Sequence, residues 1–103
     1  MGIKKIVHLN MKIIWTEKAI LENQKNIDYL IESWDQKVLI NYLNKLDKLI
    51  NLLSTNPNLG QYDKEIESNK ILVVKQIYIF YEMRDNQIVI RSFWNNYKKP
   101  FWL

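Results

Sequence analysis

The chain has 103 residues, a length at which one folded domain with one core is expected. It contains no cysteine, which excludes disulfides, thiolate nucleophiles and cysteine-based metal sites and suits a reducing cytoplasm. The formal net charge of +4 lies entirely after residue 69, because residues 1–69 hold nine basic and nine acidic residues and residues 70–103 hold six and two. Local positive charge is the minimum footprint of a surface for nucleic acid or an acidic partner, although a small basic protein also carries such a patch by chance.

Residues 1–10 are expected to form an N-terminal extension and residues 11–103 the domain. The extension lacks the apolar run and small-residue cleavage site of a signal peptide. No stretch approaches the roughly 18 apolar residues of a membrane span, so a cytoplasmic protein with no membrane partner is expected. The sole histidine, His8, has no carboxylate near it at ligand spacing, and we therefore expect neither a metal site nor a cofactor.

The first part of the domain predicts a strand followed by two helices. The sequence "MKIIW" (11–15) is typical of a buried strand, and Thr16 is placed to cap a first helix. A second helix is expected to begin near Ser33 or Asp35, which are rival caps, and to end at Asn56-Pro57. The apolar positions at helical spacing are Ile20, Ile27, Leu30, Ile31 and Trp34, then Leu39, Tyr42, Leu43, Leu46, Leu49, Ile50 and Leu53. Two such helices with a short connection predict an antiparallel helical hairpin.

The second part of the domain predicts a sheet. Residues 56–69 are polar and contain both Pro57 and Gly60, so they are expected to form a loop. Three β-rich runs follow, at 70–75, 77–84 and 87–94. The sequence therefore predicts an α+β fold in the order β-α-α-β-β-β, with the helical hairpin packed on a small antiparallel sheet.

The turn at Asp85-Asn86 predicts which side chains share a face of that sheet. A two-residue turn pairs Arg84 with Gln87, and regular pairing then continues along both strands. One face holds Tyr78, Phe80, Glu82, Arg84, Arg91 and Phe93 and is expected to lie open. The other face is more apolar, and we expect it to pack on the helices with Ser92 and Trp94.

Metal-free chemistry by Arg, Lys and Tyr is the catalysis that this composition allows. Phosphodiester cleavage can run in this way, with a cation stabilising the phosphate and a tyrosine or lysine moving protons. The candidate catalytic residues are Arg91, Tyr97, Lys98 and Tyr78. Each also has a structural explanation. Tyr78 can stack on Phe93 across the strands, Arg91 can pair with Glu82, and Lys98 can be a solvated end of the chain.

The chain ends in an aromatic cluster that has two interpretations. Aromatic side chains beside basic residues can stack nucleic-acid bases. They can equally form an apolar tail that packs on the body of the protein or on a partner, which we favour for Phe101 and Trp102.

The order of these elements resembles the RelE/ParE superfamily of bacterial toxins from type II toxin–antitoxin systems. The residues that carry the resemblance are "IIWTEKA" (13–19), "LINLLSTNPNLGQ" (49–61) and "YIFYEMRDNQIVIRSFWNNYKKP" (78–100). Met11 lies where members of the superfamily commonly begin, so residues 1–10 are either an addition or an overlong start.

The resemblance implies one of two activities. RelE-like members are ribosome-dependent mRNA endonucleases, whereas ParE-like members act by binding DNA gyrase. Tyr78 stands where the nuclease branch tends to place an arginine, and Asn95 and Asn96 stand near its basic or histidine positions. Because an asparagine cannot act as a general acid or base, we expect a ParE-like toxin, with the nuclease and a non-toxic binding module as alternatives.

The resemblance also implies partners and the surfaces that meet them. A cognate antitoxin is expected to wrap the toxin in a hetero-oligomer, with contacts at Leu39, Tyr42, Phe101 and Trp102. The target, DNA gyrase or alternatively the ribosome and its mRNA, is expected to meet Tyr78, Arg84, Arg91, Lys98 and Lys99.

Overall fold

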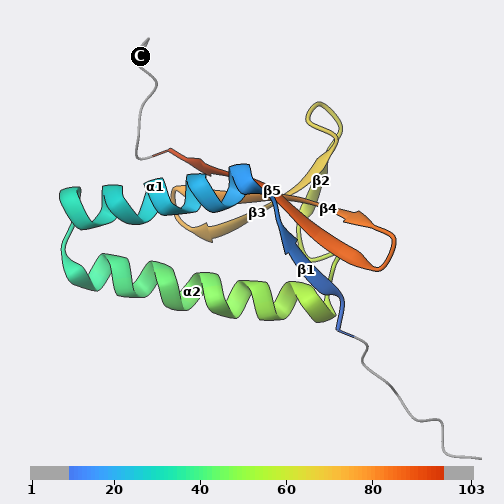
Figure 1. The fold of residues 1–103 in the computed structure, drawn as a ribbon, viewed down its shortest axis with the longest axis horizontal. Coiled ribbons are helices and arrows are strands. Elements are labelled where there is room, and N and C mark those ends of the chain that lie inside the picture. Colours follow the sequence, from blue (N-terminus) through green and yellow to red (C-terminus); the bar gives the residue numbers. More distant parts are fainter. Residues whose placement is uncertain (1–9, 97–103) are drawn as a thin grey trace, which may run out of the picture.

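The computed structural model of the protein describes residues 10–96. The predictions for residues 1–9 and 97–103, among them those for His8 and the aromatic end of the chain, concern residues outside the described range. Figure 1 shows two antiparallel helices and a twisted sheet. The elements are β1 (Lys12–Trp15), α1 (Glu17–Ser33), α2 (Gln36–Thr55), β2 (Gln61–Asp63), β3 (Ser68–Val74), β4 (Ile77–Arg84) and β5 (Gln87–Asn95).

The predicted helix ends are confirmed by their caps. Thr16 caps α1, and its hydroxyl oxygen accepts the N–H of Ala19 at 3.0 Å. Asp35 rather than Ser33 caps α2, with its carboxylate accepting the N–H of Val38 at 3.1 Å. Asn56 is the C-cap, immediately before the proline that cannot continue the helix.

The sheet is larger than the expected antiparallel one. Its strand order is β1-β5-β4-β3-β2, and β1 pairs with β5 in parallel, so the described sheet is mixed. The strand β2 lies inside the segment predicted to be a loop, because a tight turn with Glu67 at φ 48° returns the chain against β3. The α+β class and the helical hairpin are confirmed.

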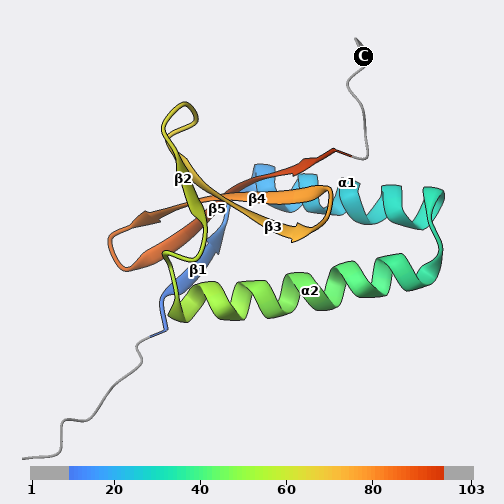
Figure 2. The same cartoon turned by 180° about the vertical axis from the view of Figure 1, so that it is seen from behind.

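The core lies between the sheet and α2, with α1 beside β5. Figures 1 and 2 show α2 along one side of the sheet and α1 next to the C-terminal half of β5. The buried apolar residues are Ala19, Leu30, Tyr42, Leu46, Leu49, Leu53, Val73, Ile77, Ile79, Tyr81, Ile88, Ile90 and Phe93. The two sides of the sheet are therefore distinct, one packed on this core and one turned away from it.

The α1 stripe expected from apolar periodicity is partly wrong. Ile20, Ile31 and Trp34 are exposed, whereas Ala19 and Asn26 are buried with Leu30. The small side chain of Ala19 is fully buried in the core, and Asn26 is the polar member of the buried stripe. On α2 the expected stripe is confirmed apart from Leu43, which is exposed.

Candidate functional site

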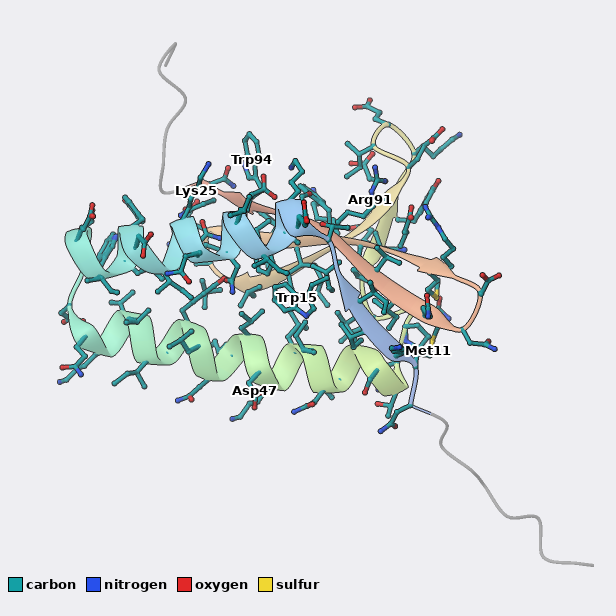
Figure 3. The ribbon with its side chains drawn as sticks, in the orientation of Figure 1. Met11, Trp15, Lys25, Asp47, Arg91 and Trp94 are labelled. Atoms are coloured by element: carbon teal, nitrogen blue, oxygen red, sulfur yellow. The ribbon has the colours of Figure 1, made fainter. Side chains whose placement is uncertain are left out.

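The face of the sheet turned away from the core carries aromatic and charged side chains together. We call it the open face, and its residues in the described strands include Lys12, Ile14, Gln61, Lys70, Leu72, Tyr78, Phe80, Glu82, Arg84, Gln87, Val89, Arg91, Ser92 and Trp94. Figure 3 shows Trp15 pointing between the helices, whereas Arg91 and Trp94 lie on the other side of the sheet. The expected open surface of aromatic residues and arginines is therefore present, although its membership differs from the prediction.

A β-bulge at Arg91 changes which aromatic residue faces outwards. Pairing follows the predicted register from Arg84 and Gln87 to Tyr81 and Ile90, and Phe80 then pairs with Ser92. Arg91 is thus an extra residue in β5, and the bulge reverses the facing of every residue after it. Three predictions are corrected in consequence: Phe93 is buried at 4% exposure, Trp94 is exposed at 47%, and Ser92, paired with Phe80, lies on the open face and not on the side that meets the helices.

The buried Phe93 is held by the start of α1. Its ring stacks on Trp15, with centroids 5.5 Å apart, and its N–H donates to the Glu22 carboxylate at 3.0 Å. The hydroxyl of Thr16 lies 3.1 Å from the carbonyl oxygen of Ile90 and 3.0 Å from that of Arg91. The strand β1 pairs with β5 only as far as Ile90. Beyond that residue, the side chains of Thr16 and Glu22 bond to the backbone of β5 where a neighbouring strand would.

Arg91 lies in a charged cluster on the open face. One oxygen of Glu82 lies 3.6 Å from the Arg91 guanidinium, and the other accepts a hydrogen bond from Arg84. The expected pairing of Arg91 with Glu82 is therefore confirmed. One carboxylate faces two guanidinium groups, so the cluster keeps a positive charge.

Tyr78 lies apart from that cluster. It pairs with Trp94 across the strands, and the Lys70 ammonium group lies 5.3 Å from its ring centroid in a cation–π arrangement. The predicted stacking of Tyr78 on Phe93 is wrong, because the bulge turns Phe93 into the core. Two of the four candidate catalytic residues are described, and each has a separate set of partners.

A groove of about 520 Å³ crosses the open face beside α1. Its lining residues are Thr16, Lys18, Glu22, Ile66, Ser68, Phe80, Arg91, Ser92, Phe93 and Trp94. One wall is the first turns of α1, where Lys18 pairs with Glu22 at 2.8 Å, and Ile66, from the turn between β2 and β3, lines the groove as well. This groove was not predicted, because it depends on the bulge at Arg91 and on the turn between β2 and β3.

The residues expected to contact an antitoxin fall in different environments. Leu39 is half-buried on α2, while Phe101 and Trp102 lie outside the described residues. Tyr42 is fully buried, and its hydroxyl donates to Asn23 of α1 at 2.5 Å. Burial raises the pKa of the Tyr42 hydroxyl. Tyr42 therefore joins the two helices, and its placement on an accessible surface is corrected.

The helical hairpin exposes more apolar surface than expected. The exposed apolar side chains on it are Ile20, Leu21, Ile31, Trp34, Ile40, Leu43 and Leu52. The sequence indicates this exposure, because the two helices contain more apolar residues than one face of each helix can bury.

Residues 10–96 contain neither a metal-binding cluster nor a membrane-spanning helix. No group of three His, Cys, Asp or Glu side chains gathers there at a spacing that holds a metal ion. Neither of the two helices in that range is long and apolar enough to cross a bilayer.

Comparison with known proteins places this fold and face in a family. The family model of the ParE toxin of the type II toxin–antitoxin system parDE matches residues 13–96. The chain therefore belongs to the ParE toxin family of type II toxin–antitoxin systems. No curated protein matches its sequence.

Two solved structures share the fold. A chain of the chromosomal ParDE toxin–antitoxin system from P. aeruginosa superposes with a TM-score of 0.70 at 14% identity, over 86% of this chain and 98% of that one. A conserved hypothetical protein from Helicobacter pylori, solved in solution, gives a TM-score of 0.55 at 14% identity, over 85% and 97% of the two chains.

Proposed function

We propose that this toxin stops growth by binding DNA gyrase through its open face, in the cytoplasm, and that a cognate antitoxin neutralises it. The observation that supports binding over cleavage is that Arg91 and Tyr78, the two candidate catalytic residues that the structure describes, have separate sets of partners. The Arg91 guanidinium lies beside the Glu82 carboxylate, which also binds Arg84. The Tyr78 ring instead faces the Lys70 ammonium group. A nuclease needs its cation and its proton-transfer group on the same phosphate.

The hairpin supports the antitoxin part of the proposal. Its exposed apolar residues suit the apolar side of an amphipathic segment that orders on binding. The positive charge of the last third of the chain suits an acidic partner. The candidates Lys98, Lys99, Phe101 and Trp102 remain proposals for these two surfaces, as do Arg84 and Leu39.

A supercoiling assay tests the proposal. The full chain should inhibit gyrase in a dose-dependent way, and the antitoxin encoded beside it should restore activity. Arg84→Ala and Arg91→Ala should weaken inhibition, whereas Lys48→Ala, which removes the same charge from the exposed face of α2, should not. Unaffected gyrase at large molar excess, together with mRNA cleavage in a translating extract, would establish the nuclease alternative instead.

A further inference from the structure

The groove on the open face has an aromatic wall that is accessible from solvent. Trp94 and Phe80 both line it, and Tyr78 is the cross-strand partner of Trp94. The indole N–H of Trp94 donates to the side chain of Asn96, which fixes the ring although 47% of the residue is exposed. A large aromatic ring held in place at the surface offers its face to a planar ligand without further ordering.

Positive charge surrounds this wall. Arg91 lies in the groove, and it shares the single carboxylate of Glu82 with Arg84. Lys70 is the cross-strand neighbour of Phe80 and lies over the ring of Tyr78. The two arginines at Glu82 and the lysine over Tyr78 therefore attract an anionic ligand that has a planar part.

The carboxylate inside the groove does not cancel that attraction. One oxygen of Glu22 accepts the N–H of Phe93 at 3.0 Å, and the other pairs with Lys18 at 2.8 Å. Both oxygens are thus engaged with groups at the edge of β5 and on α1. Lys18 and Glu22 neutralise each other, so Arg91 is the remaining charged side chain among those that line the groove.

We infer that this groove binds single-stranded nucleic acid, with bases stacked on Trp94 and Phe80 and phosphates held by Arg91 and Lys70. Stacking on aromatic side chains combined with a positively charged groove is the general mode of sequence-tolerant binding to single strands. A duplex is disfavoured because its base faces are covered by neighbouring pairs, so the rings would meet only its phosphates. A groove of about 520 Å³ lies within the range that accommodates a small ligand such as an unstacked nucleotide. This inference goes beyond gyrase binding, because it concerns a nucleic-acid ligand that the toxin binds without gyrase.

Fluorescence anisotropy with the full chain tests the aromatic wall. Labelled single-stranded oligothymidylate, oligouridylate and a DNA duplex of the same length serve as probes. We expect tighter binding of either single strand than of the duplex, and an affinity that falls with salt. Trp94→Ala should weaken single-strand binding about 5- to 100-fold. Trp34→Ala is the matched control, since Trp34 is 45% exposed but lies at the end of α1, and it should bind as the wild type does.

A second set of measurements separates stacking from charge. An abasic strand of the same length should bind the wild type weakly and should not distinguish Trp94→Ala from it. Arg91→Gln should lower the slope of log affinity against log salt by about 1, whereas Lys48→Gln should leave that slope unchanged. Circular dichroism melts of each variant exclude unfolding as the cause of lost binding.

Several results would overturn the inference. These are no single-strand binding at low salt, equal losses in Trp94→Ala and Trp34→Ala, or equal binding of the abasic and normal strands. Binding of an acidic aromatic peptide without binding of any oligonucleotide would also overturn it and would make the groove a protein-docking site. A protein that inhibits gyrase but binds no oligonucleotide would contradict this inference alone. The two proposals can therefore fail separately.

Discussion

At the scale of single residues, Gly60 shows why a side chain is excluded at one position of the loop after α2. A Cβ atom added there would lie 2.7 Å from the hydroxyl oxygen of Tyr81, 2.8 Å from its ring and 3.0 Å from the carbonyl oxygen of Lys70. The Gly60 N–H also donates to the Tyr81 hydroxyl, which in turn donates to the carbonyl of Pro57. We expect Gly60→Ala to lower the free energy of unfolding in urea by about 1–3 kcal/mol.

The contact with Tyr81 can be isolated by a double-mutant cycle. Tyr81→Phe removes the nearest atom, so Gly60→Ala should cost less in that background than in the wild type. The expected loss of stability is steric and does not come from backbone strain, since Gly60 has no positive φ. Unchanged urea midpoints for Gly60→Ala would show that the loop moves away without penalty.

The buried hydroxyl of Tyr42 predicts a loss of stability in alkali. Burial raises its pKa above the ordinary value of 10.0, so the unfolded chain releases this proton at a lower pH than the folded protein does. The contribution to stability is complete below pH 10 and is lost as the pH rises beyond it, with a slope of up to about 1.4 kcal/mol per pH unit. Urea unfolding of Tyr42→Phe, compared with the wild type up to about pH 11, should show a flatter decline. Parallel declines would contradict the assignment.

At the scale of elements, α1 takes the place of a strand beside the end of β5. Glu22 joins the two, and we expect Glu22→Ala to lower the free energy of unfolding by about 1–2 kcal/mol and to speed hydrogen exchange at the Phe93 amide. Glu22→Gln keeps an acceptor and should do less. Glu32→Ala removes an exposed carboxylate from the same helix and is the control, measured by the same NMR exchange experiment. Unaltered exchange at Phe93 in Glu22→Ala would mean that the edge is closed by other contacts.

The same elements show how far local patterns predict this fold. The helix caps at Thr16 and Asp35 and the turn at Asp85 were predictable, because each depends on a few neighbouring residues. The buried face of α1 was not, because its buried residues include a small alanine and an asparagine while isoleucines stay outside. Which side of α1 is buried is determined by its packing against β5 and not by the apolar pattern of the helix itself.

The candidate site was less predictable than the helices. Its open face depends on the bulge at Arg91, and a regular register with Trp94 inside matched the sequence as well as the actual one with Phe93 inside. Both registers bury one large aromatic ring, so apolar alternation cannot distinguish them. The groove is also lined by Ile66, whose position depends on the turn through which β2 pairs with β3.

At the scale of the whole molecule, the chain buries one core but leaves the hairpin with apolar side chains in solvent. If an antitoxin covers them as proposed, a charge placed among them must be desolvated on binding. We expect Ile40→Asp to weaken affinity for the cognate antitoxin at least about tenfold, which corresponds to roughly 1.4 kcal/mol, measured by titration calorimetry. Its neighbour gives a matched control, since Asn41→Asp adds the same charge at an exposed position of α2 that is already polar. Both variants should unfold at nearly the wild-type urea concentration, because neither side chain is in the core. Equal antitoxin affinities of the two variants would contradict an antitoxin surface on the first turns of α2. The open face would then be the candidate binding surface for both the antitoxin and gyrase.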